Sequence, residues 1–507
     1  MSLGRVGLVA VLALPALGAA VLAVLPHRID RAARITGTAF AAAAFVLSVL
    51  LALGGDDNWF GYRPRTAGGP GVRPWHELDL TWVPGLDLRF HLGVDGVSYP
   101  LVVLTALLTL LCCAYTAWRV PAPGRGRTLV ALLLVVEVGI VGTFLALDLV
   151  LFFLFFEVVL LPMYAIIAIW GGEDRQHAAR KFALYTLFGS VLLLVGVFTV
   201  VTAAGTADLV DLTGGGELSR GTQLAAFSLL AIAFAVKSPL WPLHSWLPDA
   251  HTQAPTVGSV ILAGVLLKMG TYGLIRVAVG VAPEGARWAA PVLGTLAVAA
   301  IIVGSLVCLA QSELKRLIAY SSVGHMGFVL LGVATLTATG IQAALIGNIA
   351  HGVITGLLFF LAGAIKDRAH TGALAELGGL RESTPRLAGL LGFAAIASLG
   401  LPGLAGFWGE AFAVVAAWRV GGPFWTTLAV LAALGGALTA AYLLRLLRRV
   451  THGPATPAVL TLTPGLAGAE LAAWGPLVLL ALAIGLAPTL VLGYAEVPVE
   501  ALLEAIR

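Results

Sequence analysis

Charged residues are scarce in this sequence. Asp, Glu, Lys and Arg make up 11% of the 507 residues, whereas 59% of the residues are hydrophobic. A soluble domain of this size could not bury so much apolar surface. Apolar runs of about twenty residues recur from end to end, and this is the length at which a helix crosses a bilayer. The composition therefore predicts an all-α polytopic membrane protein.

Cysteine is also rare, and its positions argue against several kinds of site. Cys112, Cys113 and Cys308 fit no zinc, iron–sulfur or disulfide spacing. The sequence has no glycine motif for binding a nucleotide and no motif for attaching haem. Its basic residues are spread over many short loops, so the net charge of +4 does not indicate nucleic-acid binding. We expect no metal and no cofactor in this chain.

We predict about fourteen transmembrane helices. Residues 3–25 are longer than the hydrophobic part of a signal peptide, and basic residues follow them, so they are expected to be the first span. The approximate limits of the spans are 3–25, 35–54, 97–118, 128–147, 149–170, 181–203, 224–247, 258–282, 289–310, 317–337, 341–364, 387–416, 424–450 and 474–493.

The distribution of basic residues predicts the orientation. With the N-terminus outside, the inward loops contain 18 of the 30 Lys and Arg, the outward segments contain nine, and three fall inside spans. This bias predicts that both termini lie on the outer side. The longest outward loop, roughly 55–96, is expected to form a cap at the membrane interface.

Two of the predicted spans are interrupted. Pro239 and Pro242 follow Lys237 in the seventh span, and proline leaves the helical carbonyl four residues before it without its usual partner. The twelfth span contains SLGLPGLAGFWGE, residues 398–410. Non-helical backbone at membrane depth is tolerated only where protein or a water-filled cavity covers it. Breaks at corresponding places of spans four to eight and nine to thirteen indicate two inverted five-helix repeats, with discontinuous helices 7 and 12.

Several ionisable residues lie inside these spans, where a charge is costly and usually functional. Glu157 and Lys237, placed near each other, would each restore the charge of the other, which predicts a proton-responsive pair. The alternative is a static buried ion pair that fixes helix register. Lys268 lies at the centre of the eighth span. Glu137, in the middle of the fourth span, belongs either to the same network or to an entry route for protons.

Two histidines, His325 and His351, lie midway along neighbouring spans. A lone buried histidine is more often a hydrogen-bonded core residue, but two in adjacent spans suit a proton relay. The chain thus offers a lateral series whose order in space stays open: Glu157, Lys237, Lys268, His325 or His351, and Glu410.

Polar residues around these spans have less definite roles. Arg276 lies nearer the outward end and is expected to reach the interface with its long side chain. Asp148 is expected to be a turn residue. His244, Asp249 and His251 flank the break in the seventh span, where they either cap backbone groups or contact water.

Four stretches resemble the antiporter-like subunits of proton-pumping NADH:quinone oxidoreductase (complex I). The likeness covers most of the chain and is weakest in residues 1–90 and after 450. The stretches are LFFLFFEVVLLPMYAIIAIWGGEDRQHAARKFALYTLFGS, AFAVKSPLWPLHSWLPDAHTQAPTVGSVILAGVLLKMGTYGLIR, LKRLIAYSSVGHMGFVLLG and LGLPGLAGFWGE. The resemblance implies a fourteen-helix fold, proton translocation, and a bacterial-type cell (inner) membrane location.

Within this family the chain is most similar to the M branch. Glu410 stands where the L and N subunits tend to have lysine, and the long lateral helix of subunit L does not follow span fourteen. The resemblance implies that Glu157 and Lys237 form the pair of the first half-channel and that Lys268 is the central connector. It further implies that His325 and His351 are the relay, Glu410 is the exit residue, and Glu137 matches a position that is often acidic.

The resemblance also implies the organisation and the partners. The expected parts are helices 1–3 with the outward loop (1–127), two half-channels (128–282 and 283–450) and the last helix (451–507). Redox chemistry is expected in other subunits, with the L and N subunits, protons, internal water and lipid as partners. Three alternatives stay open: a Mrp-type cation/proton antiporter subunit, the membrane arm of a hydrogenase, and a structural scaffold whose charges only fix helix contacts.

Overall fold

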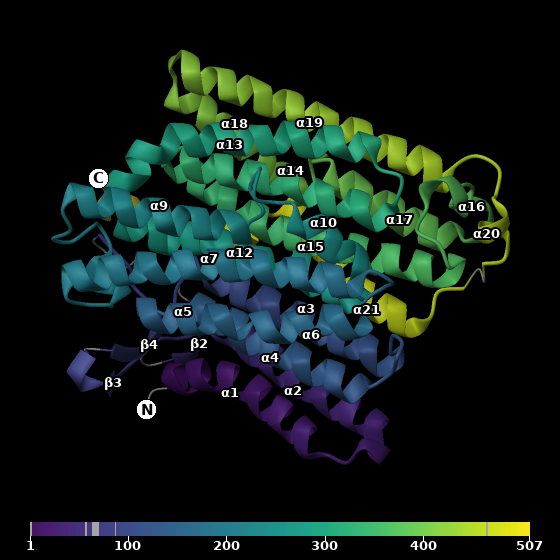
Figure 1. Cartoon of the computed structure of the whole chain (residues 1–507), viewed down its shortest axis with the longest axis horizontal. Coiled ribbons are helices and arrows are strands. Elements are labelled where there is room, and N and C mark those ends of the chain that lie inside the picture. Colours follow the sequence, from purple (N-terminus) through teal and green to yellow (C-terminus); the bar gives the residue numbers. More distant parts are fainter. Residues whose placement is uncertain (1–2, 56–57, 63–69, 87, 463–464) are drawn as a thin grey trace.

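The computed structural model describes residues 3–55, 58–62, 70–86, 88–462 and 465–507. They form a bundle of long helices that run roughly alongside one another (Figure 1). Twelve helical segments are long and apolar enough to cross a membrane. The unbroken ones are α1 Leu3–Val24, α2 Asp30–Leu50, α3 Tyr99–Trp118, α4 Gly126–Leu145, α7 Arg175–Ala204, α13 Pro283–Ala310, α14 Leu314–Ala334, α15 Ala338–Ala369, α19 Gly422–Thr451 and α21 Gly468–Leu486. The other two are α5 Leu149–Val158 with α6 Leu160–Trp170, and the run α11 Thr256–Ile261, η3 Leu262–Leu266, α12 Leu267–Gly273 and η4 Leu274–Val279.

The two predicted breaks are present. The seventh span is divided into α9 (Arg220–Lys237) and α10 (Trp246–Gln253), and the twelfth into α17 (Pro385–Ser398) and α18 (Gly406–Val420). The exact number of fourteen spans, the inverted repeats and the division of the chain into four parts stay predictions.

The last span differs from the prediction of one helix over 474–493. The structure instead has two helices, α21 and α22 (Thr489–Ala505), which meet at Ala487 and Pro488. Trp408 Nε1 of α18 donates a hydrogen bond of 2.9 Å to Gly485 O. The end of α21 therefore lies beside the break in the twelfth span.

Short elements fill the connections. They are η1 His27–Ile29, η2 Pro84–Leu86, α8 Leu209–Leu212, η5 Leu374–Glu376, α16 Leu380–Ser383 and α20 Pro457–Leu460. The predicted interfacial loop contains two antiparallel pairs of strands, β1 Leu53–Gly55 with β2 Asn58–Tyr62, and β3 His76–Val83 with β4 Leu88–Val94.

The start of α1, beside β3, and the C-terminus, toward α9, lie at the same edge of the bundle (Figure 1). Arg5 Nε donates to Glu77 O at 3.0 Å, and Gly71 N donates to Ala501 O at 3.0 Å. We call this the terminal edge. The opposite edge carries α16, α20 and the helix ends and loops that hold most of the basic residues, and we call it the basic edge. Two ends on one edge agree with an even number of crossings, whereas the side of the membrane that each edge faces stays a prediction.

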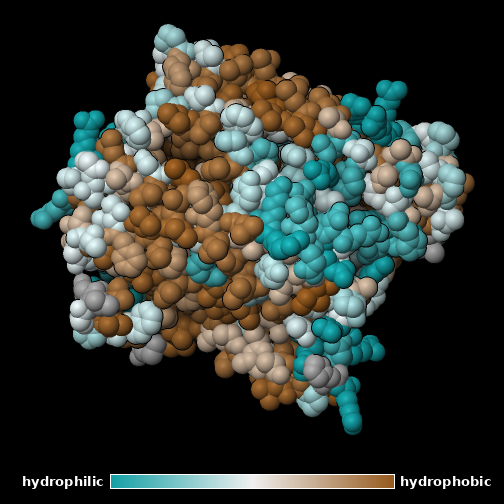
Figure 2. Space-filling model, viewed as in Figure 1, coloured by the Kyte–Doolittle hydropathy of each residue, from teal (hydrophilic) through white to brown (hydrophobic). Residues whose placement is uncertain are grey.

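The surface has the distribution of polarity that a membrane requires. Figure 2 shows hydrophobic side chains over the middle of the visible face and hydrophilic ones gathered toward the basic edge. Large apolar side chains such as Leu184, Phe188 and Phe198 of α7 are exposed there by half or more of their area. Lipid would cover such residues, because exposed apolar area of this extent is otherwise unfavourable in water.

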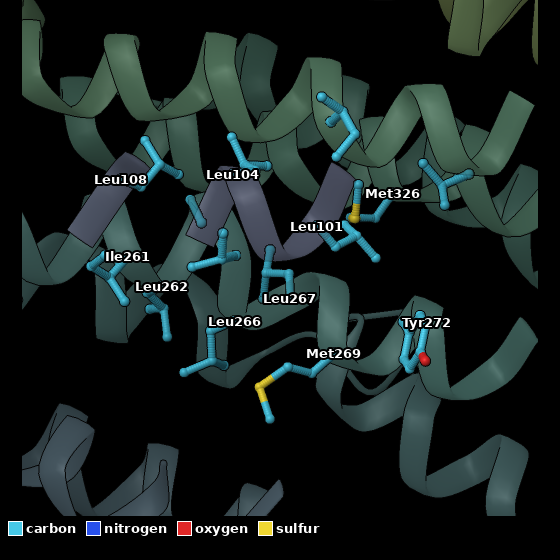
Figure 3. Close-up of a cluster of buried hydrophobic side chains, with 14 of the residues drawn as sticks. Leu101, Leu104, Leu108, Ile261, Leu262, Leu266, Leu267, Met269, Tyr272 and Met326 are labelled. Atoms are coloured by element: carbon cyan, nitrogen blue, oxygen red, sulfur yellow. The ribbon is translucent and has the colours of Figure 1, made fainter. Parts of the chain in front are cut away.

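The helix that carries Lys268 is the most deeply buried of the candidate spans. Every residue from Val257 to Val279 is buried. Apolar side chains from α3 and α14 surround it, as Figure 3 shows for Leu101, Leu104 and Leu108 of α3 and Met326 of α14. Its two π-helical segments, η3 and η4, lie on either side of the turn that contains Lys268. Such segments occur frequently at functional sites.

A buried histidine attaches the β3–β4 hairpin to the terminal edge. His91 Nδ1 lies 2.8 Å from Asp208 Oδ2, and His91 Nε2 lies 2.7 Å from Glu77 Oε1. Arg89 forms ion pairs with Asp79 and, at 3.5 Å, with Asp208. The hairpin, the connection that contains α8, and the start of α5 thereby share one polar cluster.

Protonation of His91 strengthens this cluster. Burial by itself lowers the pKa of His91, but hydrogen bonds and negative charge from Asp208 and Glu77 outweigh it and hold the pKa above its ordinary 6.5. Burial likewise raises the pKa of Asp208, but the bond and charge from His91 bring that pKa below its ordinary value. The stability that His91 contributes to the folded state is therefore complete below pH 6.5 and is lost as the pH rises through the raised pKa of His91.

We predict that the β3–β4 hairpin loosens as the pH rises through the raised pKa of His91. Hydrogen–deuterium exchange of the hairpin, corrected for the intrinsic pH dependence of exchange, should become faster across that range. His91→Gln should remove this dependence, because glutamine does not titrate. His177→Gln, an exposed histidine on α7, is the matched control and should behave as the natural sequence does. An unchanged pH dependence in His91→Gln would contradict the prediction.

Candidate functional site

Lys237 ends the first half of the broken seventh span. Its side chain is 2% exposed. Pro239 cannot donate to Ala235 O as the usual helical partner would, and Leu240 N donates to this carbonyl instead, at 2.9 Å. Trp246 Nε1 of α10 donates to Val236 O at 3.0 Å. The chain therefore turns at membrane depth without losing these backbone hydrogen bonds.

Glu157 lies across from Lys237, on α5. Ser190 Oγ of α7 donates a hydrogen bond to its carboxylate. Lys237 Nζ lies 4.7 Å from the centroid of the Phe156 ring, one residue before Glu157, and interacts electrostatically with the Glu157 carboxylate. No ion pair within 4.0 Å joins the two, and Lys237 Nζ has no hydrogen-bond partner among the described residues. The predicted pair is thus a pair of neighbours rather than a closed salt bridge.

Lys268 is completely buried and has two partners. Its Nζ donates to Ala263 O of η3 at 2.5 Å and to His351 Nδ1 of α15 at 2.6 Å. An ammonium can only donate, so Nδ1 accepts and the proton of a neutral His351 ring is on Nε2. A close approach of α15 to η3 permits this geometry. Gly352 of α15 has no Cβ, and a Cβ built there would lie only 2.6 Å from Gly264 O, so a larger residue would not fit.

His325 of α14 joins the broken twelfth span. Its Nδ1 lies 2.7 Å from Glu410 Oε1 of α18, and its Nε2 lies 3.0 Å from Ser398 Oγ at the end of α17. Gly409 allows α18 to approach α15 closely. A Cβ built on Gly409 would lie only 2.6 Å from Gly347 Cα of α15, so a side chain would not fit between the helices. The serine hydroxyl both donates and accepts, so His325 keeps both hydrogen bonds whether it carries one proton or two.

A small cavity separates the two histidines. Their ring centroids are 5.8 Å apart. The cavity has a volume of about 30 Å³, and its lining includes His325, His351, Ser398 and Glu410. This is about the volume of one water molecule, and the polar lining gives such a molecule hydrogen-bond partners. Buried His351 Nε2 has no partner among the described protein groups.

Packing rather than a hydrogen bond connects the two halves of the series. Gly270 packs closely against the break in the seventh span. A Cβ built on Gly270 would lie only 2.8 Å from Phe234 O, so a larger residue would not fit there. Ser238 Oγ is buried in the same contact and lacks a partner in the described part of the chain. No described hydrogen bond joins Lys237 to Lys268.

The remaining predicted site residue, Glu137 of α4, stands apart. It is 1% exposed, and neither carboxylate oxygen has a hydrogen-bond partner in the residues that the structure describes. Cys113 of α3 is a titratable neighbour of Glu137. The structure brings together Lys268, His351, His325 and Glu410, places Glu157 near Lys237, and joins Glu137 to neither group.

Arg276 differs from its expected role as an interfacial side chain. It is 3% exposed and forms a buried ion pair with Asp95, which follows β4. Asp95 Oδ1 also accepts from Val97 N and Ser98 N at 3.0 Å. No local pattern indicates this pairing, because the two residues are 181 positions apart in the chain.

Other polar residues take structural partners. Asp249 pairs with Lys181 at 2.6 Å and with Arg316 at 3.1 Å, near the basic edge. Asp148 caps α5 by accepting from Val150 N and Leu151 N, as its predicted position in a turn requires. Within the described ranges, no group of three or more His, Cys, Asp or Glu is arranged to hold a metal ion.

Comparisons with known proteins agree on one family. Residues 146–435 match the family described as "NADH:quinone oxidoreductase/Mrp antiporter, TM". The chain is 41% identical to NADH-quinone oxidoreductase subunit M of Rhodobacter capsulatus, over 94% of this chain and 92% of that one. A chain of respiratory complex I from Thermus thermophilus with bound NADH has a TM-score of 0.85 and 32% identity, and the match covers 99% of this chain and 100% of that one. A chain of the Mrp complex from Dietzia sp. DQ12-45-1b shares the fold, with a TM-score of 0.84, 23% identity, and coverage of 100% and 98%.

We predict that the Asp95–Arg276 pair holds η4 against the segment that follows β4. Arg276→Met should lower the free energy of unfolding by about 3–5 kcal/mol, because it leaves a buried carboxylate without its counter-ion. Asp95→Asn added to Arg276→Met should recover part of this loss. Thermal unfolding of the purified assembly measures the effect, with Arg419→Met, an exposed arginine of α18, as the control. Equal stability of Arg276→Met and Arg419→Met would contradict the prediction.

Proposed function

This chain belongs to the family of M subunits of NADH-quinone oxidoreductase, antiporter-like membrane subunits involved in proton translocation, and from this premise we propose a path for the protons. The path runs from Glu157 and Lys237 through Lys268, His351 and His325 to Glu410. The side chains of this chain carry only protons, and the redox chemistry that drives them takes place in other subunits of the complex.

The observation that supports the path is the contact series at mid-depth. Lys268 Nζ donates to His351 Nδ1 at 2.6 Å, and His325 Nδ1 lies 2.7 Å from Glu410 Oε1. A proton passes from the Lys268 ammonium to His351 Nδ1, and the proton on His351 Nε2 leaves through water in the small cavity. That proton reaches the Nε2 side of His325, and the proton on His325 Nδ1 passes to Glu410. Each transfer breaks one N–H bond and forms one N–H or O–H bond.

Lys268 must then be recharged from the first half of the chain. After its transfer Lys268 is neutral, and Lys237 is the nearest ammonium in the series. Their connection needs water beside Ser238, whose buried hydroxyl has no partner in the described structure. The charge of Glu157 holds the proton on Lys237, so a change in this pair releases it. We propose that charge movement in neighbouring membrane-arm subunits supplies that change.

The direction of movement follows from the distribution of basic residues. The basic edge faces inward by the positive-inside rule, and Glu410 begins the half-helix α18 that leads to the terminal edge. Glu410 therefore releases protons outward. The L and N subunits are proposed as the lateral neighbours, in a cell membrane of bacterial type.

We predict that Lys237→Ala abolishes proton translocation in an assembled complex. A positioned proton-transfer group typically contributes about 10²-fold or more to the rate, so pumping should fall to background. The measurement is NADH-driven acidification of membrane vesicles, with native gels to verify assembly. Arg220→Ala on the same helix removes a cation whose side chain is 74% exposed, and it should pump normally. Full pumping by an assembled Lys237→Ala complex would refute the path.

We predict that Glu410→Gln stops pumping although it keeps the volume of the side chain. Glutamine still accepts from His325 but does not take up a proton under these conditions. Glu410→Asp should retain part of the activity, and Glu382→Gln, an exposed residue at the basic edge, should retain all of it. A purely structural scaffold predicts the opposite, because a neutral side chain of equal size would preserve both helix packing and pumping.

A further inference from the structure

A second cavity, of about 360 Å³, lies at the basic edge. The ends of α3, α6 and α15 and the beginnings of α11 and α14 enclose it. Its lining includes Tyr115, Arg119, Lys315, Lys366 and Asp367. None of these side chains takes part in the proton path, so the cavity has no role in the function proposed above.

The charges around this cavity do not balance. Three cations face one carboxylate, and that carboxylate, on Asp367, lies 3.5 Å from Arg119. Lys366 has no ion pair within 4.0 Å in the part of the chain that the structure describes. Lys315 is 5% exposed, and its Nζ donates to the neutral Ala254 O at 3.0 Å. A buried ammonium is costly unless an anion compensates it, so the cavity favours a negatively charged occupant.

A tyrosine whose hydroxyl lacks a partner in the described part of the chain also lines the cavity. Tyr115 is 3% exposed and lines the cavity, yet its hydroxyl has no hydrogen-bond partner among the described residues. A buried hydroxyl without a partner costs free energy. An anion in the cavity would give the phenol an acceptor and would compensate the two lysines at the same time.

The number and depth of the donors indicate which anion. Ammonium, guanidinium and phenol groups on three helices converge, which suits an acceptor with several oxygens such as a phosphate. Trp118, exposed by 44% and packed edge-on against Tyr115, and Trp170, which lines the cavity, mark the level of lipid headgroups. Basic pockets between helices at the inward face are typical sites for anionic lipid headgroups.

We propose that this cavity binds a phosphate group, held by Lys315, Lys366, Arg119 and Tyr115. The source at this depth is the headgroup of an anionic phospholipid, and inorganic phosphate shares the same chemistry. Such a ligand ties α3, α14 and α15 together at the inward face. The proposal does not rest on the proton path, because no residue is shared with it.

The test uses the whole purified complex and two probes. In the first arm, native mass spectrometry counts the phosphatidylglycerol molecules that the complex retains after delipidation. The combination Lys315→Gln and Lys366→Gln should retain one molecule fewer than the natural sequence. In the second arm, inorganic phosphate is added to delipidated complex and its thermal unfolding is followed. A phosphate-dependent rise in Tm that the double variant loses, with equal lipid retention, would identify free phosphate as the source.

Two further variants are tested in case the double lysine variant misfolds. One is a milder change in the cavity, and the other is a control for loss of charge. Tyr115→Phe removes one hydroxyl without changing charge, and it should weaken binding of the phosphatidylglycerol about tenfold, because a hydrogen bond to a charged group is lost. Arg381→Gln with Arg386→Gln removes two exposed cations at the same edge and should retain lipid as the natural sequence does. If the double lysine variant does not assemble, Tyr115→Phe carries the test alone.

Two outcomes would overturn the proposal. One is equal lipid retention and equal phosphate response in the natural sequence and in every assembled cavity variant. The other is a structure of the assembled complex in which an acidic side chain of a neighbouring subunit fills the cavity. Loss of pumping in Lys237→Ala bears on neither outcome, so the two proposals fail separately.

Discussion

The burial of Lys268 is the constraint on which the rest of the bundle depends. An ammonium surrounded by apolar side chains is unfavourable unless it is hydrogen-bonded, and two contacts meet this need. Ala263 O of the preceding π-helical segment and His351 Nδ1 accept from its Nζ. Because the helix that carries Lys268 is buried along its whole length, these partners must come from the protein itself. A structural role alone would be met more easily by an apolar side chain, which is why the charge indicates function.

Irregular backbone is what makes the polar series possible. The breaks after Lys237 and Ser398 end two helices at mid-depth, so that α10 and α18 begin beside other helices rather than in lipid. Trp246 and Leu240 bond the carbonyls at the first break, and His325 bonds both Ser398 and Glu410 at the second. Direct contacts thus join Lys268 to His351 and His325 to Glu410, whereas the proposed path needs water between the two histidines and between Lys237 and Lys268.

Ion pairs outside the series hold the two edges. At the terminal edge, His91 and Arg276 attach the hairpin and the segment after β4 to the bundle through Asp208 and Asp95. At the basic edge, Arg368 forms a double contact with Glu470 that joins α15 to α21. The cavity beside them keeps an excess of positive charge. These ion pairs lie outside the mid-depth groups through which the proposed proton path runs.

The sequence by itself determined the class of the protein, the places of the two breaks and the titratable residues that lie within the apolar spans. Hydrophobic run length, proline, and charge within apolar stretches are local signals, so one chain suffices to find them. Only the tertiary structure decided which groups meet. It joined His351 to Lys268 and His325 to Glu410, left Glu137 apart, paired Arg276 with Asp95, and divided the last span at Pro488. The physical reason is that these contacts depend on helix rotation and on close approaches at residues such as Gly352 and Gly409, which packing of the whole bundle sets.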